Sequence, residues 1–301
     1  MKNYNDLAER HRDRIPGEFN RWVRHFGIQE EIAPILYTVA TWVKHCSWPA
    51  ASEEQRALAC MDLAVSFFYL DDYQHEDYPE LFSEFRRNLT GEQARSTRPI
   101  VHAHADLIRR LRESRQSMEK FIELRGQLLD EYLLRNSVMR GTASADFDRY
   151  WQCRLVTIYV QQWMELWFLI WDFPLAPEEH SSPLLHSAMQ SATVFYFLGN
   201  DLYSYKRDAA KGEPNLVCLW RYQHAVSTEE AASAIDRMRR EALDRFNKAF
   251  TVLTGERSPE NLKQCGHLLQ HLVNQATTAR HDNPERYVKP DQLLNSEVQP
   301  P

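Results

Sequence analysis

An apolar, aromatic stretch that ends in adjacent carboxylates restricts the fold of this chain more than any other feature. Residues 67–70 (FFYL) are followed directly by Asp71 and Asp72, and Glu76 stands four positions after Asp72. On a helix, Asp72 and Glu76 share one face, with Asp71 one position away, and such crowded carboxylates repel one another. A hard divalent cation removes this cost, and Mg²⁺ prefers a few carboxylates together with water and phosphate oxygens. The alternative interpretation is an acidic helix C-terminus in solvent.

A second group of oxygen-bearing side chains lies far down the chain. Asn200, Ser204 and Asp208 stand four residues apart, so on a helix they form one stripe. Amide, hydroxyl and carboxylate oxygens are all suitable ligands for Mg²⁺. Arg207 adjoins the stripe and could hold a phosphate through its guanidinium fork. The presence of two such groups favours a metal site over a solvated acidic patch.

Scarce glycine and long stretches with helical spacing predict an all-α fold. The 301 residues include only 9 glycines and 14 prolines, which suits long helices better than a many-turned sheet. Capping boxes at 52–55 and 227–230 open two of the helices, and no sustained strand-like alternation or internal repeat is present. We expect one domain of roughly ten packed helices over residues 1–301, with 1–6 and 288–301 as flexible tails.

Charge and cysteine usage exclude several classes of partner. A net charge of −6 argues against nucleic acid as the main partner. Five widely spaced cysteines without a CxxC pair favour a reduced, cytoplasmic protein, and the polar N-terminus has no signal-peptide core. No apolar run is long enough to span a bilayer. The sequence leaves open whether the protein is a monomer or a homodimer.

The two oxygen-rich groups resemble the metal motifs of class I terpene synthases of the bacterial, single-α-domain type. Asp71-Asp72-x-x-x-Glu76 resembles their aspartate-rich motif, and Asn200-Asp201-x-x-Ser204-x-x-Arg207-Asp208 resembles their second metal motif. The family usually ends the second motif in Lys-Glu, so Arg207-Asp208 keeps both charges and shortens the last ligand by one methylene. The resemblance implies an antiparallel helical bundle around an apolar cavity, with the two motifs facing each other across its mouth. It also implies three Mg²⁺ ions, with Mn²⁺ as an alternative ion.

The same resemblance extends to residues that would contact the substrate. Arg154 stands at about the distance before Asn200 at which the family has an arginine that senses the diphosphate. By position, Thr157 would be the linking residue, and Ile158 would act through its backbone carbonyl after a break in the helix. The family often has glycine at this last position. The alternative for Arg154 is an ordinary intramolecular salt bridge.

Two further arginines could contact the diphosphate near the C-terminus. Arg286-Tyr287 resembles the Arg-Tyr pair that hydrogen-bonds this group in the family, and Arg280 is a competing candidate for the same contact. On the resemblance, the diphosphate contacts would be Arg154, Arg207, Arg286 and Tyr287.

Aromatic side chains next to these motifs are candidates for the cavity wall. Aromatic faces stabilise a carbocation, and a dry wall prevents its premature quenching. The alternative is plain core packing, which is the usual role of aromatic residues at helical spacing. The candidates for the wall are Phe67, Phe68, Trp163, Tyr196 and Phe197.

The resemblance implies a Mg²⁺-dependent terpene cyclase that ionises an allylic prenyl diphosphate, cyclises the carbocation to a hydrocarbon or alcohol, and releases diphosphate. Farnesyl diphosphate is the favoured substrate, and geranylgeranyl diphosphate is a close second. A chain-elongating prenyltransferase is an alternative, but such enzymes carry two aspartate-rich motifs. A non-catalytic helical binding or scaffold protein would predict lost ligands at the metal positions, and only the Glu-to-Asp change is seen.

Overall fold

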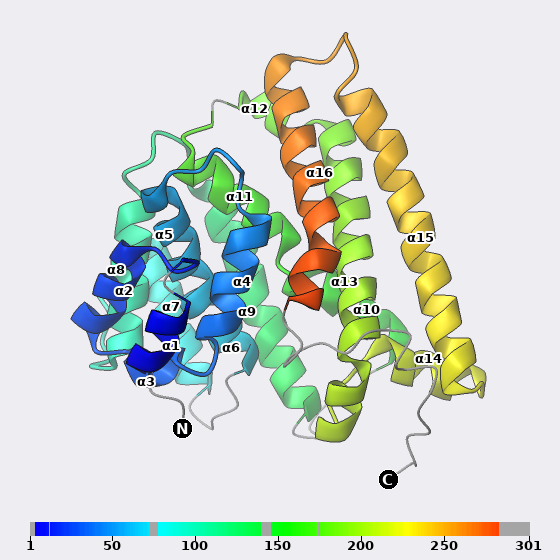
Figure 1. The fold of residues 1–301 in the computed structure, drawn as a ribbon, viewed down its shortest axis with the longest axis horizontal. Coiled ribbons are helices and arrows are strands. Elements are labelled where there is room, and N and C mark those ends of the chain that lie inside the picture. The colour runs from blue at the N-terminus through cyan, green and yellow to red at the C-terminus, as the bar shows by residue number, and fades with distance from the viewer. Residues whose placement is uncertain (1–3, 12, 73–77, 140–145, 174, 283–301) are drawn as a thin grey trace. The chain divides into compact units, whose positions relative to one another are not determined.

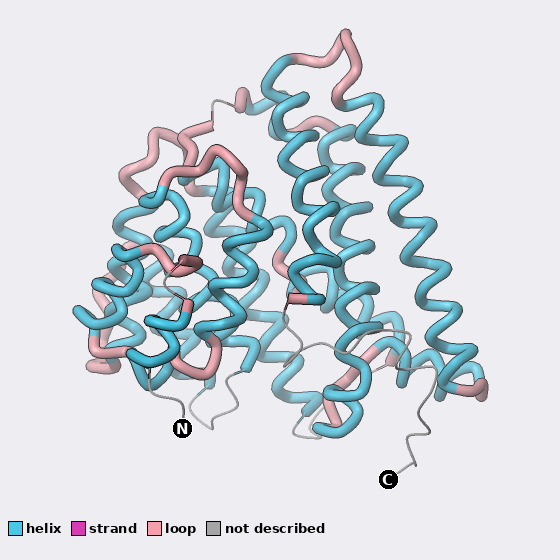
Figure 2. Tube along the Cα trace, in the orientation of Figure 1, coloured by secondary structure: helices cyan, strands magenta, loops and turns pink. Residues whose placement is uncertain are grey.

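All regular structure in the described part of the chain is helical, which confirms the predicted all-α fold class (Figures 1 and 2). The computed structural model describes residues 4–11, 13–72, 78–139, 146–173 and 175–282, and only the backbone at 71, 72, 78 and 136–139. The chain divides into two compact units. The first comprises Met1–Asn136 and Gln161–Leu175, and the second comprises Ser137–Val160 and Ala176–Pro301. The single-domain organisation expected from the sequence stays a prediction.

The helices of the first unit have 4 to 21 residues. Its elements are α1 (Tyr4–Arg10), α2 (Gly17–Phe26), α3 (Gln29–Ile32), α4 (Leu36–Cys46), α5 (Glu53–Asp62), the π-helix η1 (Leu63–Phe68), α6 (Tyr69–Asp72), α7 (Tyr78–Thr90), α8 (Pro99–Leu111), α9 (Glu119–Met139), whose C-terminal end belongs to the second unit, and α11 (Val160–Ile170). The first helix begins inside the stretch predicted to be a flexible tail. Tyr4 is buried there, and its hydroxyl donates to Asn20 Oδ1 at 2.7 Å.

The helices of the second unit have 4 to 29 residues. Its elements are α10 (Phe147–Thr157), α12 (Pro177–His180), α13 (Pro183–Lys211), α14 (Leu216–His224), α15 (Thr228–Leu253) and α16 (Glu260–His281). The number of helical segments in the described residues exceeds the rough expectation from the sequence. One reason is that stretches read as single helices, such as residues 53–72, consist of consecutive pieces.

A π-helical segment precedes the aspartate pair and changes its register. Ser52 caps α5 in the predicted capping box, with Gln55 as the reciprocal partner. At the end of η1, the Tyr69 N–H bonds to the Ala64 carbonyl, five residues back. Each residue added to a helical turn rotates all later side chains relative to a regular α-helix. The face of Asp71 and Asp72 therefore cannot be read by continuing the α-helical pattern of α5.

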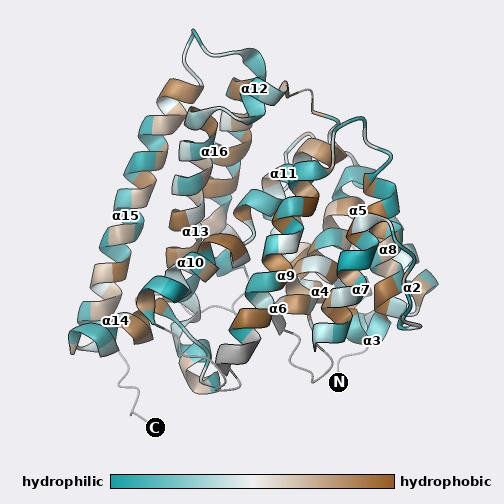
Figure 3. Ribbon diagram, turned by 180° about the vertical axis from the view of Figure 1, so that it is seen from behind, coloured by the Kyte–Doolittle hydropathy of each residue, from teal (hydrophilic) through white to brown (hydrophobic). Residues whose placement is uncertain are grey.

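The second unit is organised around α13, the longest helix. Ser182 caps it, Pro183 occupies its first turn, and it ends at Gly212 in the left-handed conformation (φ 68°). Both α15 and α16 pack against α13 (Figure 1). Hydrophilic and hydrophobic residues alternate along α15 (Figure 3), because its apolar stripe from Ala231 to Leu253 is buried while the other face is polar. Packing of amphipathic helices thus fixes α13 within its unit.

Within the described residues, no helix is both long enough and apolar enough to cross a lipid bilayer.

Candidate metal and diphosphate site

Three of the predicted ligands lie on α13 and two of them are already in contact. Ser204 donates its hydroxyl hydrogen to Asp208 Oδ2 at 2.5 Å, one helical turn away. Arg207 donates to the other oxygen, Asp208 Oδ1, from Nε at 3.0 Å and from Nη2 at 2.7 Å. Both Ser204 and Asp208 are buried, whereas a quarter of the Arg207 side chain is exposed. The carboxylate is therefore oriented by its own helix.

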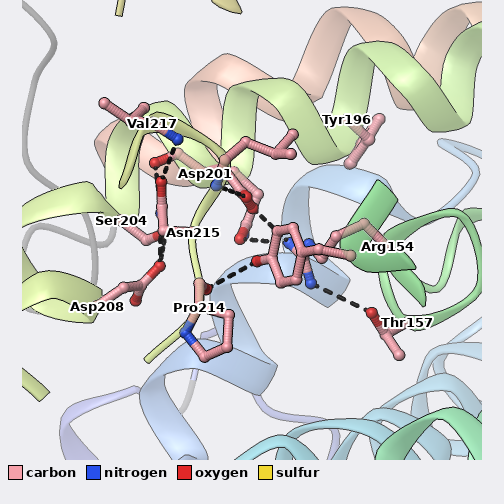
Figure 4. A network of polar contacts seen from close by, with 12 residues as sticks. Arg154, Thr157, Tyr196, Asp201, Ser204, Asp208, Pro214, Asn215 and Val217 are labelled. Atoms are coloured by element: carbon pink, nitrogen blue, oxygen red, sulfur yellow. Dashed lines mark hydrogen bonds and ion pairs between the residues drawn. The ribbon is translucent and has the colours of Figure 1, made fainter. Parts of the chain in front are cut away.

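A residue from the loop after α13 holds the same carboxylate. Asn215 is fully buried and donates through Nδ2 to Asp208 Oδ2 and to the main-chain carbonyl of Asp201, both at 2.9 Å. Its Oδ1 accepts from the Val217 N–H at 2.9 Å and so caps α14. One amide thus joins the start of α14 to the predicted ligand. Asn215 and its neighbours are visible in Figure 4.

Arg154 contacts the head of the stripe. Its Nη2 donates to Asn200 Oδ1 at 2.8 Å. Nη2 also forms an ion pair with Asp201 Oδ1 at 3.1 Å, and Nη1 donates to Thr157 Oγ1 at 3.4 Å (Figure 4). The Arg154 side chain is only 9% exposed and that of Asp201 only 1%. The salt bridge that was the alternative for Arg154 is therefore present. The same guanidinium also contacts Asn200, the first predicted metal ligand of the α13 stripe.

Asp201 links Arg154 to the start of α14. Its Oδ2 accepts from the Leu216 N–H at 2.9 Å. The Tyr150 hydroxyl donates to the Pro214 carbonyl at 2.9 Å and also hydrogen-bonds the Asp201 side chain. Burial raises the pKa of the Asp201 carboxyl above its usual value, and the Arg154 charge and the Leu216 hydrogen bond oppose this effect. The position after Asn200 is thus a structural junction of α10, α13 and α14.

The helix carrying Arg154 breaks directly after the predicted linking residue. α10 ends at Thr157, Ile158 has φ −72° and ψ −11°, and Tyr159 has φ 74° before α11 begins at Val160. A left-handed conformation at a bulky residue costs about 1–3 kcal/mol and marks candidate functional sites. The strained position is Tyr159, so Ile158 keeps an ordinary backbone conformation and needs no glycine. The chain also passes from the second unit to the first just after this break.

The predicted residues of the first unit are described only in part. The backbone of Asp71 and Asp72 forms the end of α6, and Glu76 lies outside the described residues. Phe67 and Phe68 lie in η1 with ring centroids 4.7 Å apart. Phe68 is buried, whereas Phe67 is partly exposed. A π-helical segment before the aspartate pair fits a functional position, because such segments concentrate at functional sites.

The remaining aromatic candidates are buried among partners of their own unit. Trp163 donates from Nε1 to the Cys46 carbonyl at 3.2 Å in the first unit. In the second unit, the Tyr196 hydroxyl donates to the Leu272 carbonyl at 2.7 Å, and Phe197 meets Trp151 edge to face at 4.7 Å. These contacts agree with core packing, the alternative interpretation of the aromatic residues. Their placement on a cavity wall stays a prediction.

Of the C-terminal arginines, only Arg280 can be located. Arg286 and Tyr287 lie outside the described residues. Arg280, near the end of α16, is buried, and its Nη2 donates to the Tyr196 carbonyl of α13 at 2.7 Å.

The donor set on α13 fits a hard divalent cation. An amide oxygen, a hydroxyl and a carboxylate at successive turns are oxygen ligands of the kind that Mg²⁺ takes, together with water and phosphate oxygens. Within the described residues, no group of three or more His, Cys, Asp or Glu side chains could hold a metal ion. The α13 stripe differs from such groups because Asn200 and Ser204 supply two of its three oxygens.

Sequence reasoning missed the residues that orient the stripe. Asp201 lies within the second motif and Asn215 follows it, but the motif pattern assigns neither residue a role in positioning. A signal for Asn215 exists, since an asparagine after Gly212 and Pro214 and before an apolar run is typical of a helix N-cap. No comparable local signal identifies Asp201, because its partners come from α10 and from the start of α14.

Comparison with known proteins gives the same fold. The linalool/nerolidol synthase of Streptomyces clavuligerus has a TM-score of 0.77 at 16% identity, over 93% of this chain and 96% of that protein. The 2-methylisoborneol synthase of Streptomyces coelicolor A3(2), solved with Mg²⁺ and geranyl-S-thiolodiphosphate, has a TM-score of 0.77 at 13% identity, over 93% of each chain. No curated protein sequence matches this chain significantly.

A family model places the chain more directly than these structural likenesses. The model described as terpene synthase family 2, C-terminal metal binding, matches residues 62–245, which is more than half of the chain. The match includes the aspartate pair, Arg154 and the whole α13 stripe. The all-α structure and this match agree, and the chain belongs to terpene synthase family 2.

Proposed function

We propose that this protein is a class I terpene cyclase that uses Mg²⁺ to ionise an allylic prenyl diphosphate and then cyclises the carbocation to a terpene hydrocarbon or alcohol. Farnesyl diphosphate is the favoured substrate, with geranylgeranyl diphosphate next. The proposed metal ligands are Asp71, Asp72, Glu76, Asn200, Ser204 and Asp208.

The arrangement around Arg154 is the observation that supports this function best. A buried guanidinium contacts Asn200 at 2.8 Å and Asp201 at 3.1 Å, and the helix that carries it breaks four residues later. Five residues after this arginine, Tyr159 adopts a left-handed conformation, a type of strain that concentrates at functional sites. The combination fits a site in which a cationic side chain meets a charged ligand next to a metal.

Residues of the second unit would hold the diphosphate end of the substrate. Arg154 and Arg207 present fixed guanidinium forks, which match phosphate oxygens in geometry and charge. Thr157 bonds the Arg154 Nη1 and so orients it. α10 ends at Thr157, and we assign the Ile158 carbonyl, the first one beyond the helix, to the substrate. Mg²⁺, when bound, supplies positive charge that stabilises the departing diphosphate.

The chain's own apolar residues would then protect the carbocation. Loss of diphosphate breaks the allylic C–O bond, and the electron pair leaves with the diphosphate oxygen. Phe67, Phe68 and Trp163 in the first unit, and Tyr196 and Phe197 in the second, are the proposed aromatic wall. Their ring faces would stabilise the cation, and their exclusion of water would delay quenching until ring closure.

Substrate length is the finer question. Two relatives in the comparison carry short analogues: the linalool/nerolidol synthase was also solved with 2-fluorogeranyl diphosphate, and the 2-methylisoborneol synthase with geranyl-S-thiolodiphosphate. Their identity to this chain is low, so geranyl diphosphate enters the test beside the two longer substrates. A cytoplasmic enzyme, monomeric or homodimeric, stays our prediction.

The direct test is incubation of the purified protein with geranyl, farnesyl and geranylgeranyl diphosphates, with and without Mg²⁺. Volatile extracts are read by mass spectrometry, and released diphosphate is measured in parallel. A cyclic product that requires Mg²⁺ is the expected result and identifies the chain length. A longer prenyl diphosphate formed with added isopentenyl diphosphate would favour the prenyltransferase alternative. Absence of diphosphate release from all three substrates would refute the proposed activity.

Asn200→Ala tests the metal assignment within this function. The substitution removes the amide oxygen that accepts from Arg154 and leaves a helix-compatible side chain in α13. We expect turnover to be lost while the helical circular dichroism spectrum is unchanged. Full activity with the wild-type Mg²⁺ dependence would contradict the assignment.

A further inference from the structure

A buried arginine from α16 lies against the turn of α13 that carries Asn200. Arg280 is 1% exposed, and its Nη2 donates to the Tyr196 carbonyl at 2.7 Å. The guanidinium carbon lies 5.3 Å from the centroid of the Tyr196 ring and 5.7 Å from that of Tyr203. The guanidinium is therefore held by a carbonyl and two aromatic rings of one helix.

The carbonyl that Arg280 contacts belongs to the backbone of the metal stripe. In an α-helix, the carbonyl of residue i accepts from the N–H of residue i+4, so the Tyr196 carbonyl is the helical partner of the Asn200 N–H. A carbonyl oxygen has two lone pairs and can accept from both donors. Arg280 thus donates to the same carbonyl that holds the Asn200 N–H, and so helps to fix the position of the Asn200 backbone. Arg154, by contrast, contacts the side-chain oxygen of the same residue.

The absence of a side chain at position 199 makes this contact feasible. A Cβ built on Gly199 would lie 2.9 Å from Nη1 of Arg280, 3.2 Å from Cζ and 3.4 Å from Nη2. The guanidinium therefore lies so close to Gly199 that a side chain at this position would force it to shift. Glycine in the middle of a long helix is unfavourable by itself. The close approach of Arg280 gives a physical reason for it at this position.

We propose that Arg280 is a positioning residue for the metal site, and that the missing side chain at Gly199 leaves room for its guanidinium. The proposal rests on the proposed function, because it takes Asn200 as a metal ligand. Arg280 fixes the Tyr196–Asn200 turn of α13 through the Tyr196 carbonyl, and this holds the Asn200 amide at the position from which it binds the cation. Arg280 therefore serves the site through the backbone and does not itself contact the diphosphate.

Gly199→Ala and Arg280→Lys test the proposal in complementary ways. The alanine keeps the arginine and its charge but displaces the guanidinium from the Tyr196 carbonyl. The lysine keeps the charge but loses the planar fork and its stacking on the tyrosines. Gly266→Ala is the matched control, because its Cβ would lie 2.8 Å from the Thr254 methyl group, in a contact between α15 and α16 that involves no charged group.

The measured quantity is the Mg²⁺ concentration at which saturating inorganic diphosphate gives half of its maximal thermal stabilisation. Positioning partners of metal ligands typically contribute 10- to 100-fold in metal affinity. We therefore expect this midpoint to rise about 10-fold or more for Gly199→Ala and Arg280→Lys, and to stay within about twofold for Gly266→Ala. In turnover assays, the first two variants should need a higher Mg²⁺ concentration for half-maximal activity. This concentration should change by a larger factor than their kcat at saturating Mg²⁺.

The double variant separates positioning from general loss of stability. Once Arg280→Lys has removed the fork, the added methyl group at 199 has little left to displace, so the effects of the two substitutions on the midpoint should not add. Equal midpoint shifts for Gly199→Ala and Gly266→Ala would refute the proposal, as would an unchanged midpoint in Gly199→Ala. If the wild-type protein shows no stabilisation by Mg²⁺ and diphosphate, the proposed function itself fails and this inference fails with it.

Discussion

Asn215 should contribute to stability through two separable parts of one side chain. Its Oδ1 caps α14, while its Nδ2 donates to the Asp201 carbonyl and to the Asp208 carboxylate. Serine is a good N-cap but is too short to make both Nδ2 contacts. Asn215→Ser should therefore keep the cap and lose two buried hydrogen bonds, whereas Asn215→Ala should lose all three.

The expected magnitudes follow from the chemistry of each bond. A neutral hydrogen bond contributes about 1 kcal/mol net and one to a charged group about 2 kcal/mol, so Asn215→Ser should cost about 3 kcal/mol. Loss of the cap adds about 1 kcal/mol for Asn215→Ala. Ser227→Ala, at the N-cap of α15, measures the loss of a cap alone, because the Ser227 Oγ accepts only from the Glu230 N–H in the capping role.

Chemical denaturation followed by circular dichroism measures the free energy of unfolding of these variants. If Asn215→Ser loses no more stability than Ser227→Ala, the two Nδ2 contacts contribute nothing and the reasoning is wrong. Asn215→Asp adds a second readout, because it keeps the cap and brings a carboxylate against Asp208 Oδ2. Like charges at this distance are costly unless a cation lies nearby, so Mg²⁺ should stabilise this variant more than it stabilises the wild-type protein.

Three further predictions concern the first unit. Burial lowers the pKa of His104 to about 3, so this histidine stays neutral in the folded protein but gains a proton below about pH 6.5 in the unfolded chain. The free energy of unfolding, measured by denaturation, should therefore fall by about 2 kcal/mol between pH 6.5 and pH 5. This fall should be absent in His104→Gln. In the core, the Arg125 guanidinium donates to both carboxylate oxygens of Asp62, at 2.6 and 2.7 Å. Asp62→Ala removes this counter-charge and should lower the free energy of unfolding by about 3–5 kcal/mol. A decrease of less than about 1 kcal/mol in urea denaturation would contradict this expectation. Phe67→Ala should change the product pattern, read by mass spectrometry, more than it changes the rate of diphosphate release, and an unchanged pattern would remove Phe67 from the proposed wall.

The features that sequence could predict are those set by spacing along one helix. Asn200, Ser204 and Asp208 share a stripe because four residues make about one helical turn, whatever the rest of the chain does. The cap at Ser52 was predictable for the same reason, since all its partners lie within four residues. Local geometry of this kind needs no knowledge of tertiary packing.

Contacts between helices were not predictable in this way. The Asp62–Arg125 pair joins α5 to α9 in the core, and neither residue stands in a pattern that distinguishes it from a surface charge. The π-helical segment before Asp71 was missed as well, because the α-helical pattern was continued through η1. The resemblance implied a helix break after Arg154, but it gave no indication that Tyr159 would adopt the left-handed conformation. Each of these features depends on packing that a linear pattern does not contain.

The middle of α13 serves three neighbours at once, which explains its unusual composition. One stripe, from Asn200 to Asp208, carries the proposed ligands, and the adjacent Gly199 admits Arg280 from α16. Asp201 points to the third side, where Oδ1 forms an ion pair with Arg154 and Oδ2 accepts from the Leu216 N–H. An asparagine at this position would offer one acceptor for two donors and would turn its own N–H₂ group toward one of them. The carboxylate at 201 is therefore required by hydrogen-bond geometry even though burial disfavours its charge, and this requirement is independent of any metal at Asn200.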